Sequence, residues 1–132
     1  MSGVNSDTSV VISGFAKDVD TVLTALEQAE GKKVNPKRLK VSHGFHSPCV
    51  EPMLDDLCAI IGSVNFAEKP TIPIICNLTG RVVEGGELST PQYWRDHTRN
   101  AVRFSDAVHT LADLELCRVL YDSIGSDASL WQ

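Results

Sequence analysis

The stretch VSHGFHSPCVEPM, residues 41–53, places His43 and His46 just ahead of Pro48 and an apolar helical pattern. The residues before it alternate, so the sequence predicts a strand that ends where a helix begins. A histidine at such a junction lies beside the unpaired N–H groups of the first helical turn. The partial positive charge there disfavours imidazolium and keeps the ring neutral near pH 7.

Residue types alone leave three interpretations of the segment His43-Gly-Phe-His46 open. It could be a surface turn in which neither histidine has a role. It could bind a metal, but two ligands are too few, and His97 and His109 have no carboxylate cluster at ligand spacing. It could hold a general base, which needs an acceptor for its second ring nitrogen and a nucleophile within hydrogen-bond reach.

The composition is that of one soluble globular domain. The chain has 132 residues, of which 42% are hydrophobic and 22% are charged, and its net charge is -5. An acidic chain without a clustered basic patch is a poor candidate for binding nucleic acid or an anionic membrane. The densest basic stretch, residues 32–40, is interrupted by Val34, Asn35 and Pro36, and we predict a solvated loop and strand edge there.

The sequence indicates a cytoplasmic protein. No apolar run approaches the roughly 20 residues that span a bilayer, and the first nine residues, MSGVNSDTS, are too polar for a signal peptide. No two cysteines form a C-x-x-C pair, so we expect small buried thiols in a reducing compartment. The cysteines are Cys49, Cys58, Cys76 and Cys117.

Strand and helix patterns alternate along the chain, which indicates α/β architecture. We expect residues 1–8 to be a disordered or trimmed end. Asp18 is a good helix N-cap, and either Pro48 or Pro52 suits the first position of a later helix. The expected elements are a strand at 9–14, a helix from 18 to about 31, a strand at 37–42, a helix at 50–61, a strand at 72–77, a turn at 84–87, helices at 90–97 and 104–114, and a strand at 117–121.

The segment SHGFHSP, residues 42–48, resembles the VSHAFHSP segment in acyltransferase domains of modular polyketide synthases and in malonyl-CoA:acyl-carrier-protein transacylases. Four further segments are similar to that family in the same order, so the resemblance runs from about residue 7 to the end. They are VVISG at 10–14, EPMLDDL at 51–57, ICNLTG at 75–80, and YWRDH followed by VRFSDAV between 93 and 108.

The resemblance implies the C-terminal portion of an acyltransferase domain with a two-subdomain α/β fold. Residues 9–42 would be part of a small ferredoxin-like subdomain. Residues 43–132 would be the C-terminal part of a large hydrolase-like subdomain.

The resemblance also implies roles for five residues. His46 matches the family's catalytic base. His43, Gly44 and Phe45 match positions that shape substrate selectivity, and a histidine at position 43 is associated with malonyl rather than methylmalonyl units. His97 lies where the family offers a main-chain carbonyl to the base. No metal site is expected.

The activity implied is acyl transfer in polyketide or fatty acid biosynthesis. Malonyl or a related unit would pass from coenzyme A to the phosphopantetheine thiol of an acyl carrier protein. No bound cofactor is implied, and the partners would be acyl-CoA, the carrier and the remainder of the domain. The family's G-H-S-x-G nucleophile segment is absent from these 132 residues, so we expect the isolated chain to be inactive. The alternative is a non-catalytic remnant or docking module of a megasynthase.

Overall fold

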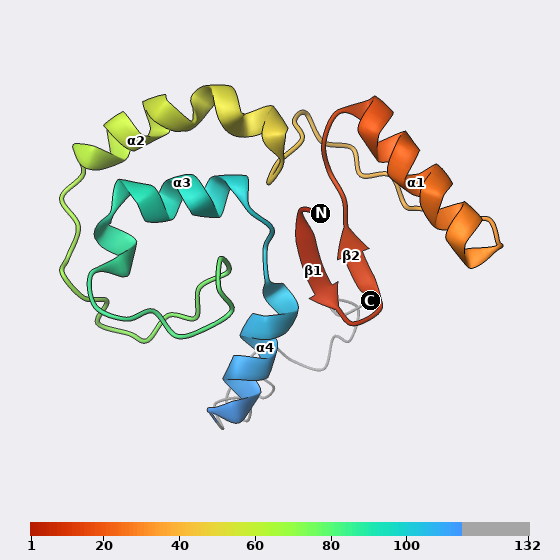
Figure 1. The fold of residues 1–132 in the computed structure, drawn as a ribbon. Coiled ribbons are helices and arrows are strands. Elements are labelled where there is room, and N and C mark those ends of the chain that lie inside the picture. Colours follow the sequence, from red (N-terminus) through yellow and green to blue (C-terminus); the bar gives the residue numbers. More distant parts are fainter. Residues whose placement is uncertain (115–132) are drawn as a thin grey trace.

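The computed structural model describes residues 1–114, and these contain both strands and helices, as an α/β protein requires (Figure 1). The predicted strand at 117–121 lies outside the described residues. In chain order the elements are β1 (Gly3–Ser6), β2 (Ser9–Val11), α1 (Ala16–Glu30), the 3₁₀ helix η1 (Pro48–Met53), α2 (Leu54–Gly62), the 3₁₀ helix η2 (Glu87–Ser89), α3 (Pro91–Arg99) and α4 (Phe104–Asp113).

Strands β1 and β2 form an antiparallel hairpin that lies between α1 and α4 (Figure 1). The prediction of a disordered end was wrong for residues 3–6, because the β-branched run of β2 pairs with them. β1 is also bonded on its other side, where the Val4 N–H donates to the Val102 carbonyl and the Val102 N–H donates to the Ser2 carbonyl, both at 2.9 Å. The hairpin is therefore fixed to the segment that precedes α4.

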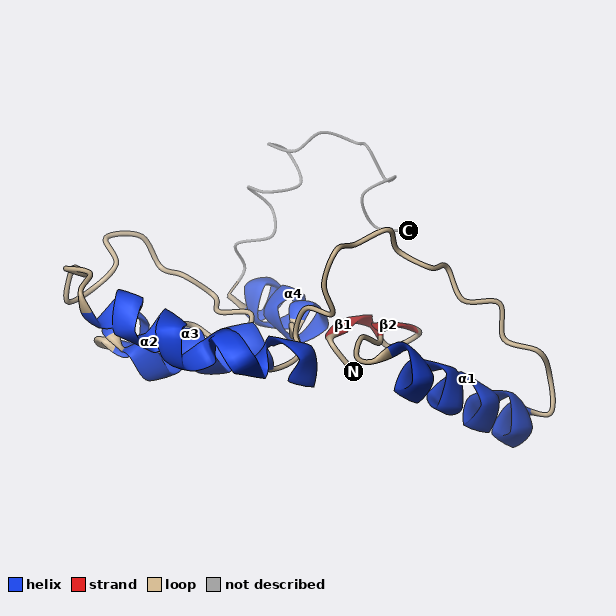
Figure 2. Ribbon diagram, turned by 90° about the horizontal axis from the view of Figure 1, so that it is seen from above, coloured by secondary structure: helices blue, strands red, loops and turns tan. Residues whose placement is uncertain are grey.

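Helix α1 confirms the first predicted helix, but Asp18 lies in its first turn rather than at its cap. The N-cap is Phe15, which offers no side-chain hydrogen bond. Gly31 ends the helix in the left-handed conformation (φ 63°), a conformation that glycine adopts without steric cost. No residue of α1 is buried, and Figure 2 shows the helix to one side of the molecule, away from α2 and α3.

The predicted strand at 37–42 was wrong, since these residues form an extended loop that arches back from the end of α1 (Figure 2). Leu39 and Val41 alternate as in a strand but are 58% and 60% exposed. A strand is stabilised by cross-strand neighbours, and the described residues place none beside this segment. The Arg38 guanidinium instead bonds the Asp20 carboxylate of α1 at 3.0 Å.

The helix predicted at 50–61 is confirmed in its second part only. Pro48 takes the first position of the six-residue η1, Pro52 lies inside it, and α2 begins at Leu54. Proline has no N–H to donate to the carbonyl four residues earlier, and its ring clashes with that carbonyl. Pro52 therefore explains why the segment before Leu54 is a 3₁₀ helix.

Helix α3 confirms the predicted helix at 90–97 and packs along α2 (Figure 1). The Thr90 hydroxyl caps it by accepting from the Tyr93 N–H at 3.2 Å, and Pro91 follows at the first helical position. Tyr93 joins Cys76 and Val83 in the small buried core, against which Leu78, Leu88 and Trp94 pack. This core holds α3 in place beneath α2.

The predicted strand at 72–77 was also wrong, because the segment makes only one isolated bridge, Ile75 to Val82. Pro70 and Pro73 remove backbone donors on either side of Ile72, which is 74% exposed. The turn expected at 84–87 forms with Gly85 at φ 56°. The helix predicted at 104–114 is confirmed as α4.

The cysteines of the described chain are free thiols, with Cys76 buried and Cys49 and Cys58 half-buried. Among the helices of residues 1–114, none has the length and hydrophobicity of a membrane-spanning segment.

Candidate active site

His46 lies half-buried on the loop before η1, with its ring against the end of α3. Its Nδ1 is 3.1 Å from the main-chain oxygen of His97. A carbonyl oxygen only accepts hydrogen bonds, so Nδ1 carries the hydrogen, and in the neutral ring Nε2 is then the nitrogen with the lone pair. That tautomer and orientation are what a general base needs.

The backbone of His46 adopts a left-handed conformation (φ 53°), and it is the only non-glycine residue among residues 1–114 with positive φ. Histidine is one of the few side chains enriched in that region. Sparsely populated backbone conformations persist only where the surrounding structure enforces them. The contacts of the adjoining residues show how this one is held.

Ser47, only 2% exposed, closes the turn around His46. Its hydroxyl donates to the Gly44 carbonyl and accepts from the Cys49 N–H, which caps η1. On the other side of His46, the Ser13 hydroxyl donates to the Phe45 carbonyl. The loop is therefore bonded on both sides of the histidine.

His97 contacts His46 through its ring as well as through its main-chain carbonyl. The rings of His46 and His97 meet edge to face with centroids 6.0 Å apart, and His97 stacks on Tyr93 at 5.9 Å. Burial, and then the charge of a protonated His46, lower the pKa of His97 below its ordinary value. The His97 ring therefore stays neutral to a lower pH than an ordinary histidine.

His43 and Phe45 lie at the surface of the same loop. Their rings are 5.9 Å apart, the Ser42 hydroxyl is 2.7 Å from Nδ1 of His43, and Phe45 is 53% exposed. Gly44 lies deeper, and a Cβ built on it would be 3.1 Å from the sulfur of Cys49. The catalytic and selectivity roles of all these residues stay predictions.

The electrostatic argument from a helix terminus does not apply to His46. The element that follows is a six-residue 3₁₀ helix capped by Ser47, and α2 begins only at Leu54. The helix-dipole effect falls off within the first turn of a helix. His46 is oriented by hydrogen bonds instead.

Ser13 and Ser47 are the supporting residues that sequence reasoning missed. A serine followed by proline before a helical pattern is an N-cap signal, so Ser47 could have been found. Ser13 contacts a residue 32 positions away and has no local signal.

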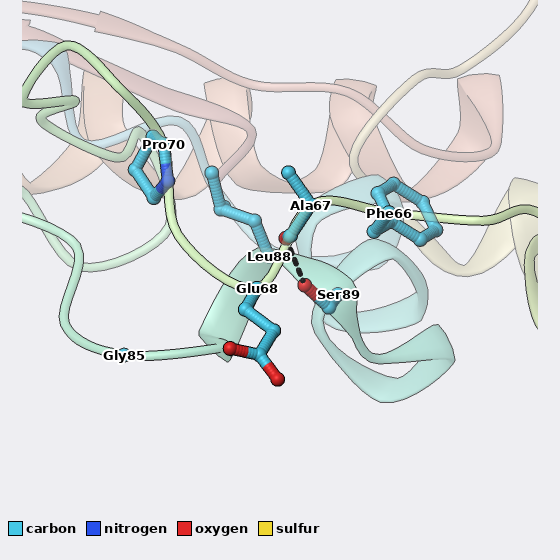
Figure 3. A pocket seen from close by; sticks show the side chains of 7 residues that line it. All are labelled: Phe66, Ala67, Glu68, Pro70, Gly85, Leu88 and Ser89. Atoms are coloured by element: carbon cyan, nitrogen blue, oxygen red, sulfur yellow. Dashed lines mark hydrogen bonds between the residues drawn. The ribbon is translucent and has the colours of Figure 1, made fainter.

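The rest of the described chain offers few further candidates for a functional site. Residues 1–114 contain no group of three side chains placed to hold a metal, and His109 is exposed on α4. A small open cleft lies between residues 66–70 and 85–89, and Figure 3 shows the Ser89 hydroxyl pointing to the Ala67 carbonyl there. None of the residues lining it belongs to the His46 loop.

The chain is similar to known proteins in both sequence and fold. The family model described as "Acyl transferase domain" matches residues 1–119. Polyketide synthase GfsA of Streptomyces halstedii is 44% identical over 111 residues, which are 84% of this chain and 1% of that protein. Mycoketide-CoA synthase of Mycobacterium tuberculosis is 41% identical over 108 residues, 82% of this chain and 2% of that protein.

Among solved structures, the acyltransferase domain from the second module of the salinomycin polyketide synthase is similar in fold and sequence. It superposes with a TM-score of 0.75 at 38% identity, over 85% of this chain and 25% of that domain. The chain therefore spans about a quarter of the length of that domain and a far smaller part of the synthases.

Proposed function

Because this chain belongs to the acyl transferase domain family, we propose that it supplies the general base, His46, for acyl transfer within a polyketide synthase. The observation that carries the proposal is the 3.1 Å contact between Nδ1 of His46 and the His97 carbonyl. In the neutral ring this contact directs the hydrogen to Nδ1 and leaves Nε2 as the acceptor nitrogen, and a positioned base contributes about 10²–10⁴ in rate.

In the proposed first step, Nε2 of His46 takes the proton of a serine hydroxyl while the serine oxygen attacks the thioester carbonyl of an acyl-CoA. The carbon–sulfur bond breaks, and the imidazolium returns the proton to the leaving thiolate of coenzyme A. In the second step, His46 takes the proton of the phosphopantetheine thiol of an acyl carrier protein. That sulfur attacks the carbonyl carbon of the acyl-serine, the carbon–oxygen bond of the ester breaks, and the imidazolium returns the proton to the serine oxygen. The reaction would take place in the cytoplasm without a bound cofactor.

The proposed acyl donor is malonyl-CoA or a related extender unit, selected at positions 43–45. His43 and Phe45 present adjacent rings at the loop surface, and Gly44 has little free space around it. A pocket that discriminates by shape alone separates substrates differing by one carbon by roughly 10–200-fold. Changes at these positions are therefore expected to alter preference more than rate.

The nucleophilic serine has to come from outside these 132 residues, since the sequence contains no G-H-S-x-G segment. We therefore propose that the isolated chain transfers no acyl group. The second candidate is a non-catalytic remnant that keeps the fold for docking.

One experiment separates these possibilities. The chain is incubated with radiolabelled malonyl-CoA, first alone and then joined to the N-terminal part of the salinomycin acyltransferase domain. We expect no label on the chain alone and transfer by the joined protein. In the joined protein, His46→Ala should lower the rate about 10²–10⁴-fold, whereas His109→Ala, at an exposed histidine of α4, should not change it. Full activity of the His46 variant would overturn the assignment, and a folded but inactive joined protein would favour the remnant.

A further inference from the structure

A hydrogen bond joins the chain just after the β1–β2 hairpin to the loop that carries His46. Ser13 follows β2, and its hydroxyl donates to the main-chain carbonyl of Phe45, the residue immediately before His46. The two residues are 32 positions apart, so the bond connects parts of the fold that the chain itself does not hold together.

The Phe45 carbonyl and the His46 N–H belong to the same planar peptide unit. The angle φ of His46 is the rotation about the bond from the nitrogen of this peptide unit to the Cα that carries the imidazole. A bond that holds the carbonyl therefore limits φ, which here is 53°, a value that L residues other than glycine rarely adopt.

The hairpin is itself anchored to the chain that follows His97. Val4 of β1 and Ser2 just before it exchange backbone hydrogen bonds with Val102, which lies five positions after His97. The contacts thus form a closed ring. The hairpin is bonded to Val102, and the chain just before Val102 supplies the His97 carbonyl that holds the His46 ring. Ser13, two residues after the hairpin, holds the His46 peptide. Backbone and ring of His46 are fixed against one framework.

We propose that Ser13 is a positioning residue for His46: its hydroxyl fixes the Phe45–His46 peptide so that Nδ1 of His46 faces the His97 carbonyl. Its importance for acyl transfer rests on the proposed function of His46. The geometric effect can be tested without any acyl transfer.

The test measures the tautomer of His46 by nitrogen chemical shifts in the ¹⁵N-histidine-labelled chain, with its signals assigned from His46→Gln. In the unaltered chain we expect the Nδ1–H tautomer. Ser13→Ala should lower the ratio of Nδ1–H to Nε2–H by roughly 5–10-fold, the factor that corresponds to one ordinary hydrogen bond. Ser13→Thr keeps a hydroxyl and should restore the ratio.

Ser89→Ala is the matched control. It removes another hydroxyl that donates to a distant main-chain carbonyl, that of Ala67 at 3.0 Å (Figure 3). This variant should leave the His46 tautomer unchanged. If Ser13→Ala does not fold, Ser13→Cys keeps the side-chain shape with a weak donor and should lower the ratio to an intermediate value.

An unchanged tautomer in a folded Ser13→Ala or Ser13→Cys chain would overturn the proposal, as would an equal change in Ser89→Ala. This outcome differs from failure of the proposed function, which would appear as acyl transfer that persists without His46.

Discussion

The imidazoles of His46 and His97 meet edge to face with centroids 6.0 Å apart, while the main chain of His97 bonds the His46 ring at 3.1 Å. One residue thus orients the proposed base through its carbonyl and borders it with its side chain. Two protonated rings at this separation would repel each other. The lowered pKa of His97 avoids that state when His46 accepts a proton.

The lowered pKa of His97 predicts an acid-dependent loss of stability. The unfolded chain binds a proton on His97 near its ordinary pKa of 6.5, before the folded chain does. This contribution to the free energy of unfolding is therefore complete above about pH 6.5 and decreases as the pH falls below it, by at most about 1.4 kcal/mol per pH unit. His97→Phe keeps the carbonyl and an aromatic ring. Urea unfolding between pH 5 and 8 should show a smaller pH slope for this variant, and equal slopes would contradict the interpretation.

Gly80 should not tolerate a side chain. Its φ is 72°, and an added Cβ would overlap the Cβ of Asp106 and lie 3.1 Å from the Asp106 carbonyl carbon. The substitution Gly80→Ala should cost free energy both from the left-handed backbone and from overpacking. Together these should destabilise the chain by about 2–5 kcal/mol. Gly85 also has positive φ but open space around it, so Gly85→Ala should cost only about 1–2 kcal/mol. Denaturant titration of both variants measures the difference, and similar losses would show that the contact with α4 is unimportant.

Gly44 occupies a position where the resembling family commonly has alanine. Here a Cβ would be 3.1 Å from the sulfur of Cys49 and 3.2 Å from the Ser47 hydroxyl oxygen. Gly44→Ala should therefore lower stability by about 1 kcal/mol, and Cys49→Ala should recover part of that loss. A double-mutant cycle should give a coupling of about 0.5–1 kcal/mol. Strict additivity would mean that Cys49 is not the residue that limits the space.

Thr90 should stabilise α3 through its cap. Its hydroxyl accepts from the Tyr93 N–H, and Tyr93 is part of the buried core. Thr90→Ala should reduce the free energy of unfolding by about 1 kcal/mol. Thr24→Ala removes a hydroxyl that only bonds the Asp20 carbonyl on the exposed surface of α1. Thermal unfolding of both variants measures the difference. Thr24→Ala should change the free energy of unfolding little, and a loss equal to that of Thr90→Ala would argue against capping as the cause.

Helices were predictable from the sequence where local signals agreed. Thr90-Pro91 at the start of α3 and the apolar spacing of α4 are properties of neighbouring residues, and both helices form as expected. The start of α2 was misplaced, because two prolines each suited a first helical position. The second of them, Pro52, lies inside the 3₁₀ segment.

Strands were less predictable, because a strand depends on a partner that local sequence does not reveal. Residues 37–42 alternate without a neighbour, whereas residues 3–6 pair despite a polar appearance. The candidate site shows the same division. His46 and the His97 carbonyl were expected from motif positions, but the Ser13 contact depends on tertiary structure alone.

The exposure of α1 predicts that this helix unfolds separately from the rest of the described residues. An isolated helix of about 15 residues is only marginally stable in water, and α1 buries none of its 15 residues to improve on that. Its backbone can open without disturbing the core around Tyr93, so its amide hydrogens should exchange with solvent at nearly the rate of a free peptide. Ser13 precedes α1, and the hydrogen bonds of the hairpin do not involve α1. The bond from Ser13 to the loop that holds His46 can therefore persist each time α1 opens.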